Sequence, residues 1–238
     1  MVRPKRHEAG RTYRETFTPG VFGPLLGEDM GVFRTAPDPV TGEQRLVGSL
    51  PLFADGAGHA GLTPHTSATT TLYRDGVKVA ENDDPLTGAR PFPVDAADAE
   101  YRLTTSVERS ADIAAASTRV DAGFTFRSKQ VTATTALPVS TVRFARPVDL
   151  ASRAPAGLSV LVPVTEQGAA AGRNRGSLAV SVSVSYDDGR TWRPVTVTNG
   201  RISVKSPAKD RGISLSAQVT DKQDNTSTLT IHNGWYGR

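Results

Sequence analysis

Short stretches in which apolar and polar residues alternate recur along the whole chain, and no stretch shows the periodicity of an amphipathic helix. Clear examples lie at residues 69–81, 101–109, 117–129 and 177–186. A period of two predicts strands that bury one face only, and the Asp-Gly pairs at 75–76 and 188–189, within the first stretch and just after the last, predict tight hairpin turns. The sequence therefore predicts an all-β protein built from antiparallel strands.

The stretch SVSYDDGRTW, residues 183–192, is the most patterned one in the chain. From its third residue onward it is similar to the Asp-box, a hairpin motif best known from the blades of sialidase-type propellers. A propeller repeats its blade several times, whereas this chain contains the motif once, so we expect a hairpin and not a propeller. We interpret it as a structural turn motif, in which a carboxylate accepts hydrogen bonds from turn amides and a glycine supplies a positive φ. Its residues are Ser185, Asp187, Gly189, Thr191 and Trp192.

The composition of the sequence changes near residue 138, where three prolines occur within eighteen residues, at 138, 147 and 155. Proline cannot donate to a sheet ladder, so we place a domain boundary there. Residues 16–137 are predicted to form a jelly-roll-like β-sandwich. Residues 138–238 offer about seven short strands, which is typical of an immunoglobulin-like or fibronectin-like sandwich. Residues 1–15 are polar and basic, and we interpret them as a tail or linker.

Charge and composition narrow the classes of partner. The formal charge of +4 comes from 28 basic and 24 acidic residues, which are interspersed outside the first fifteen positions. This pattern predicts no nucleic-acid interface. The absence of cysteine excludes disulfides and thiolate metal sites. No window resembles a signal peptide or a membrane-spanning helix, so we expect neither in this sequence.

Candidate catalytic and metal-binding side chains are few. Asp55 and His59 lie in a glycine-rich loop, ADGAGHAG, which we interpret as a turn because no serine nucleophile motif accompanies them. The four histidines, at 7, 59, 65 and 232, lack the spacing of zinc ligands. We therefore expect no enzymatic activity and no cofactor. Calcium stays open, because oxygen ligands often come from β-loops and one loop offers Asp221, Asp224 and Asn225.

Aromatic residues offer a different kind of site. Most large apolar side chains are buried, and we expect most aromatics here to be core residues. Trp235 and Tyr236 lie near the end of the sequence and are predicted as the pair exposed for binding. Exposed aromatics on β-sandwiches commonly recognise glycans or protein surfaces. The partner would then be a polysaccharide or a protein surface.

Several blocks together resemble a known family region. In order, they are LPLFADGAGHAG, TTTLYRDGVKV, YRLTTSVERS, STRVDAGFTFRS, LPVSTVRFA, VSVSYDDGRTW and VTDKQDNTSTLTI. From about residue 17 to residue 235 the chain is similar to the C-terminal, non-catalytic region of secreted actinobacterial subtilisin-like serine peptidases. The peptidase motifs H-G-T-H and G-T-S-M-A do not occur in this sequence.

The resemblance implies accessory β-sandwich modules within a larger secreted, extracellular protein. Their role would be to stabilise or position a protease domain in the same chain, or to bind substrate surfaces. The alternative is a stand-alone protein that binds carbohydrate or protein surfaces.

Overall fold

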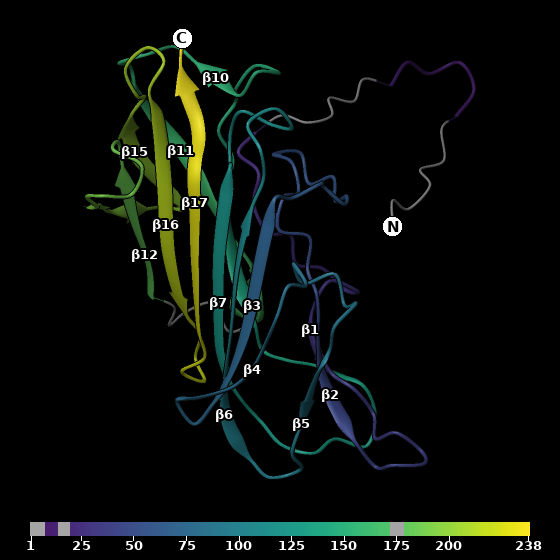
Figure 1. Cartoon of the computed structure of the whole chain (residues 1–238). Helices are drawn as coiled ribbons and strands as arrows, with labels where there is room; N and C mark the ends of the chain where they lie inside the picture. Colours follow the sequence, from purple (N-terminus) through teal and green to yellow (C-terminus); the bar gives the residue numbers. More distant parts are fainter. Residues whose placement is uncertain (1–7, 14–19, 172–178) are drawn as a thin grey trace.

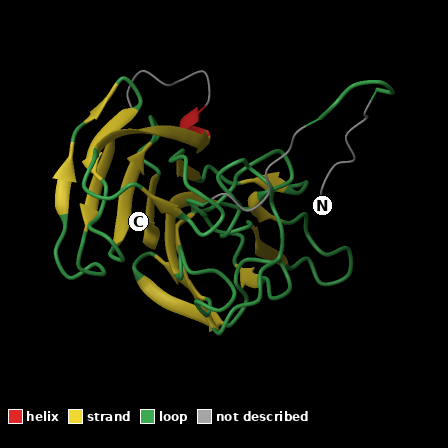
Figure 2. Cartoon of the chain, turned by 90° about the horizontal axis from the view of Figure 1, so that it is seen from above, coloured by secondary structure: helices red, strands yellow, loops and turns green. Residues whose placement is uncertain are grey.

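The computed structural model describes residues 8–13, 20–171 and 179–238, and strands with their connecting loops make up nearly all of it (Figures 1 and 2). Within these residues the one helical element is a short 3-10 turn, η1 (Ala169–Ala171). The prediction of an all-β fold with antiparallel sheets is confirmed. In the part of the chain that is described, no helix is long and apolar enough to cross a membrane.

One long sheet runs through the molecule (Figure 1). Its strands are β3 (Ser67–Arg74), β4 (Val77–Asn82), β6 (Ala99–Glu108), β7 (Arg119–Ser128), β10 (Arg153–Ala154), β12 (Ala179–Ser185), β13 (Arg193–Val195), β16 (Gly212–Thr220) and β17 (Thr226–Gly237). The neighbours follow the order β13-β12-β16-β17-β7-β6-β3-β4, and β10 adds to β17 in parallel. All other pairs of this sheet are antiparallel.

Two smaller sheets pack against the apolar face of the long sheet. The first consists of β1 (Gly31–Arg34), β2 (Gln44–Ser49), β5 (Phe92–Val94) and β8 (Thr135–Ala136), in the order β5-β2-β1-β8. The second consists of β9 (Ser140–Phe144), β11 (Ser159–Gly168), β14 (Val197–Thr198) and β15 (Arg201–Lys205), in the order β14-β15-β11-β9. Each covers one half of the long sheet, so the molecule is a pair of β-sandwiches (Figure 2).

The alternation in the sequence explains which face is covered. Along β6, Tyr101, Leu103 and Val107 are buried, while Arg102 and Thr104 between them point to the other face. A fully buried side chain of this size contributes about 1.5–3 kcal/mol relative to an exposed one. The buried residues of both sandwiches belong to one hydrophobic cluster.

The two sandwiches join where β17 pairs with β7. The pairing runs from Thr226 opposite Thr125 to His232 opposite Arg119. We call this line of contact, where strands from the two parts of the sequence meet, the seam. The sheet thus continues across the boundary predicted near residue 138, and both of its halves turn the same face to solvent.

Loop contacts also cross that boundary. The Arg143 guanidinium donates to the carbonyls of Gly23 and Ala54, which belong to the first part of the sequence. Separate folding of 16–137 and 138–238, and the jelly-roll-like and immunoglobulin-like classes, stay predictions. Of the predicted tail, residues 8–13 are exposed and irregular, and the others lie outside the described residues.

Candidate functional site

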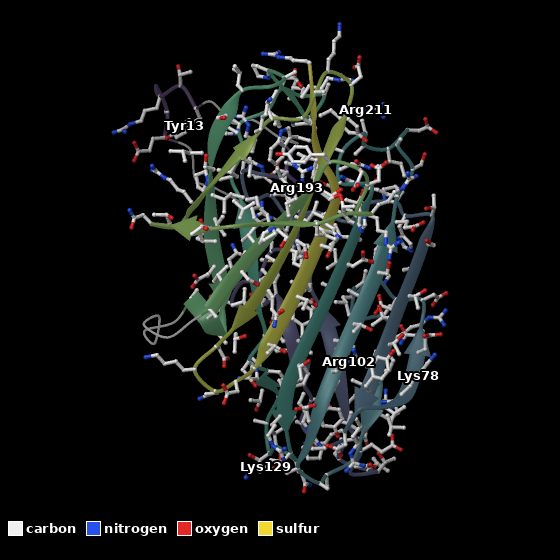
Figure 3. All side chains as sticks on the ribbon, turned by 90° about the vertical axis from the view of Figure 1, so that its left-hand side faces the viewer. Tyr13, Lys78, Arg102, Lys129, Arg193 and Arg211 are labelled. Atoms are coloured by element: carbon white, nitrogen blue, oxygen red, sulfur yellow. The ribbon has the colours of Figure 1, made fainter. Side chains whose placement is uncertain are left out.

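The outer face of the long sheet is polar, because the apolar half of each alternating strand points inward. Each of its six longest strands places a hydroxyl side chain on this face. They are Thr69, Thr104, Thr125, Thr228, Ser216 and Ser183. Figure 3 views this face, where the side chains stand off strands that lie side by side and no second sheet covers the described residues. A wide hydroxyl-rich surface is therefore open to solvent.

The Asp187 carboxylate organises the turn that follows β12. Its Oδ1 accepts hydrogen bonds from the Ser185 hydroxyl at 2.7 Å and the Thr191 amide at 2.9 Å. Its Oδ2 accepts one from the Thr191 hydroxyl at 2.6 Å. The bonds from Thr191 and Ser185 lower the pKa of Asp187 to about 2. The turn is closed by Asp188 and Gly189, whose φ values of 60° and 85° explain the aspartate-glycine pair.

The turn places the partly exposed Trp192 and His232 of β17 beside the same glycine, Gly189. The position that a Cβ on Gly189 would take lies 3.4 Å from a ring carbon of Trp192 and 3.4 Å from a ring carbon of His232. Both rings therefore lie close to Gly189, at about van der Waals distance from that Cβ position. Trp192 remains 36% exposed.

A string of polar groups crosses three strands beside His232. The His232 Nε2 lies 3.0 Å from Asp121 Oδ2, and the Arg119 Nε donates to Asp121 Oδ1 at 2.8 Å. Arg119 also lies 3.7 Å from the carboxylate of Glu108. The seam creates this string, because Glu108 and Asp121 come from the first sandwich and His232 comes from the last strand of the second.

The Asp121 carboxylate is the most buried charge of the string. Its burial opposes ionisation, but hydrogen bonds from His232, Ser106 and Arg119 outweigh that effect and lower the pKa of Asp121. Asp121 therefore carries a negative charge at neutral pH and can accept hydrogen bonds from a bound ligand.

An open hollow of about 310 Å³ lies beside this string. Its lining includes Glu108, Arg119, His232 and Asn233. Arg109 also lines it and is itself buried, with its guanidinium stacked 4.4 Å from the ring centres of both Phe22 and Phe53. This burial lowers the pKa of Arg109 to about 10. The hollow is therefore lined by polar side chains, one of which, Arg109, is held between two aromatic rings.

A break in strand register shapes the same place. The pairing of β16 with β17 shifts between Ile213 and Leu215, and Asn233 in the opposite segment has a φ of 54°. The Asn233 amide donates to the Ser214 hydroxyl at 3.0 Å. Bulges of this kind often lie next to functional sites, where they redirect side chains.

The predicted binding pair divides between core and surface. Trp235 was predicted to be exposed, and this was wrong: it is fully buried, because it points to the apolar face of β17 together with Leu229 and Ile231. Tyr236 is half-buried on the outer side. Burial raises the pKa of its hydroxyl, and the nearby Asp188 carboxylate adds to this effect.

The residues of the loop considered for calcium bind one another. Asp221 Oδ1 accepts hydrogen bonds from the amides of Gln223 and Asn225, and its Oδ2 accepts one from the Asn225 side chain. Asp224 has a φ of 61°, which places it in the turn. Among the described residues, no three His, Asp or Glu side chains gather as metal ligands would.

The loop with Asp55 and His59 closes on itself in a similar way. Asp55 Oδ1 accepts hydrogen bonds from the amides of Ala57 and His59, and its Oδ2 lies 2.9 Å from His59 Nδ1. The carboxylate is thereby occupied in holding the loop.

The sequence did not predict that Asp121 and His232 lie close together. A signal was present at each position, because His232 follows the outward threonines Thr228 and Thr230, and Asp121 is an acidic residue at an outward position of an alternating strand. Their proximity depends on the pairing of β7 with β17, which the alternation alone does not specify.

Comparison with known proteins finds no family model that matches this chain and no curated protein that matches its sequence. The chemistry of the site has therefore to be judged from its own geometry. It offers fixed hydrogen-bond donors and acceptors on the exposed sheet face and one exposed aromatic ring, an arrangement suited to binding.

Proposed function

We propose that this chain is a non-catalytic binding module, which attaches a larger secreted protein of the subtilisin-like peptidase type to a surface. The observation that carries the proposal is the seam site, where Trp192 and the string from Glu108 to His232 share one open, polar sheet face. Binding to such a site requires no conformational change, and a rigid sheet holds its side chains in fixed positions.

The partners of the two Asp-His pairs favour binding over catalysis. A serine hydrolase needs a hydroxyl on the histidine nitrogen that faces away from the aspartate. In His232 that nitrogen is Nδ1, and within the described residues the ring hydrogen-bonds only to Asp121, through Nε2. In the other pair, the Asp55 carboxylate holds backbone amides of its own loop.

Two measurements test the non-catalytic proposal. The purified chain is incubated with a fluorophosphonate probe and with casein, and an active subtilisin serves as the positive control. We expect neither labelling nor cleavage. Stoichiometric labelling of one serine would overturn the proposal.

A sedimentation assay tests binding itself. The chain is mixed with insoluble polysaccharides and with fibrillar collagen, and the pelleted fraction is compared with that of a non-binding protein of similar size. We expect saturable pelleting with at least one surface, and no pelleting with any of them would contradict the binding role.

The association with a peptidase rests on the resemblance of the sequence blocks. Reading the gene upstream of this segment tests it. A subtilisin-like domain in the same reading frame would support the association, whereas an independent start codon would favour the stand-alone binding protein.

A further inference from the structure

We infer that the seam site is a subsite for one unit of a neutral polysaccharide. This inference rests on the proposed binding function and names the chemical class of its ligand. It follows from three features of the described residues: the exposed ring of Trp192, the fixed polar string beside it, and the balance of charge around both.

Trp192 supplies the apolar surface. A sugar ring presents C–H groups on its faces and hydroxyls around its edge, so an indole can pack against one face while polar groups reach the edge. Trp192 is 36% exposed, whereas Trp235, the only other tryptophan, is fully buried. The Asp187 turn holds Thr191, the residue directly before Trp192, so the backbone that carries the indole is ordered before a ligand binds.

The polar string supplies the hydrogen bonds. Asp121 is ionised and accepts hydrogen bonds, Arg119 donates, and His232 can do either, according to its tautomer. A sugar hydroxyl both donates and accepts, so it can bind to each of these groups. Trp192 and His232 both lie beside the Cβ position of Gly189, so the indole ring and the polar string are neighbours on the outer face.

The charges of the string and of the neighbouring Arg109 favour a neutral ligand. Glu108 and Asp121 are negative, Arg109 and Arg119 are positive, and the salt bridges of Arg119 join it to both carboxylates. An acidic polymer would need an excess of positive charge here. The lining of the hollow includes Arg119 and His232 but neither Trp192 nor Asp121, so the hollow extends the site beyond His232. At about 310 Å³ it is at the small end of the range for ligand pockets and suits one unit of a chain that continues along the open face.

The test measures affinity for neutral and acidic polymers. Binding of the purified chain is measured by sedimentation with cellulose, chitin and insoluble β-glucan, with insoluble polygalacturonate as the acidic polymer and fibrillar collagen as the protein surface. The variants are Trp192→Ala and Asp121→Asn. Tyr73→Ala is the matched control, because Tyr73 is an aromatic residue of the same outer face that lies on β3, away from the seam.

We expect at least one neutral polymer to bind, and each site variant to weaken that binding on the order of tenfold or more, as loss of a central contact does. Tyr73→Ala should bind like wild type. Acrylamide quenching provides a second readout, because the buried Trp235 is shielded and bound polymer should protect Trp192. A change of fold would instead alter the melting temperature, which is measured for every variant.

The remaining outcomes separate this inference from the proposed function. Neutral-polymer binding that both site variants leave unchanged would overturn the inference and leave the binding function standing. Binding only to collagen or only to polygalacturonate would do the same. Failure to bind any surface would overturn both.

Discussion

Replacing Ile231 by alanine should destabilise the whole molecule and not one half of it. Ile231 lies on β17 at the seam and is 1% exposed. It pairs with Val120 on one side and Leu215 on the other. Its Cδ1 lies 3.0 Å from the Cβ position of Gly23, in the first part of the sequence. The side chain therefore packs against residues of both sandwiches.

The expected loss follows from this burial. Truncating a fully buried isoleucine to alanine costs about 2–5 kcal/mol, as the lost transfer energy and the cavity combine. For a chain of this size, 1 kcal/mol shifts the melting temperature by roughly 2–4 °C, so the expected drop is about 4–20 °C. Leu161→Ala is the control, because Leu161 is 61% exposed and its removal should shift the melting temperature by only about 2 °C or less.

Differential scanning calorimetry gives the melting temperature of each variant and the number of unfolding transitions in one experiment. We expect a single transition in wild type and in Ile231→Ala, displaced as a whole, because the two sandwiches share one sheet and one hydrophobic cluster. Guanidinium unfolding followed by circular dichroism and by tryptophan fluorescence should give coincident curves. Two resolved transitions of which only one moves, or a shift no larger than that of Leu161→Ala, would refute this reasoning.

Two further predictions concern loops. Asp187→Ala should lower the melting temperature at pH 7 more than Asp188→Ala does. The pKa of Asp187 is lowered from 3.8 to about 2, so the stabilisation by its carboxylate is fully present above pH 4 and is lost as the pH falls through 2. The difference in melting temperature between wild type and Asp187→Ala should therefore shrink from pH 7 to pH 2, measured at pH 7, 4 and 2. A difference that stays constant over this range would contradict the turn role. Calcium should leave the melting temperature unchanged, because Asp221 already accepts hydrogen bonds from Gln223 and Asn225. If millimolar calcium raised the melting temperature and EDTA reversed the rise, the loop would bind calcium after all.

The positions of the strands were predictable where the alternation was strong, but which strands pair with one another was not. The patterns at residues 101–109 and 117–129 correspond to β6 and β7, and the turn at Asp188-Gly189 lies where the sequence indicates. Alternation decides which side chains point inward, but any antiparallel neighbour satisfies it. The pairing of β17 with β7 therefore could not be derived from the pattern.

The error at Trp235 has a different cause. Extending the alternation of β17, in which Leu229 and Ile231 point inward, also directs Trp235 inward. The prediction of exposure relied on its position near the end of the sequence, which carries no information about burial in a central strand. The proline-containing stretch that suggested a boundary still holds a strand, β9, between Pro138 and Pro147.

The seam also sets an order of events during synthesis. Thr125 of β7 pairs with Thr226 of β17, so the ribosome makes the partner of β7 about a hundred residues later. At a synthesis rate of roughly 5–20 residues per second, one edge of β7 stays unpaired for on the order of 5–20 s. An unpaired edge can recruit a strand from another nascent chain. Expression conditions that slow elongation or crowd nascent chains should therefore favour aggregation, and a chaperone that shields β7 until β17 emerges should raise the yield of folded protein.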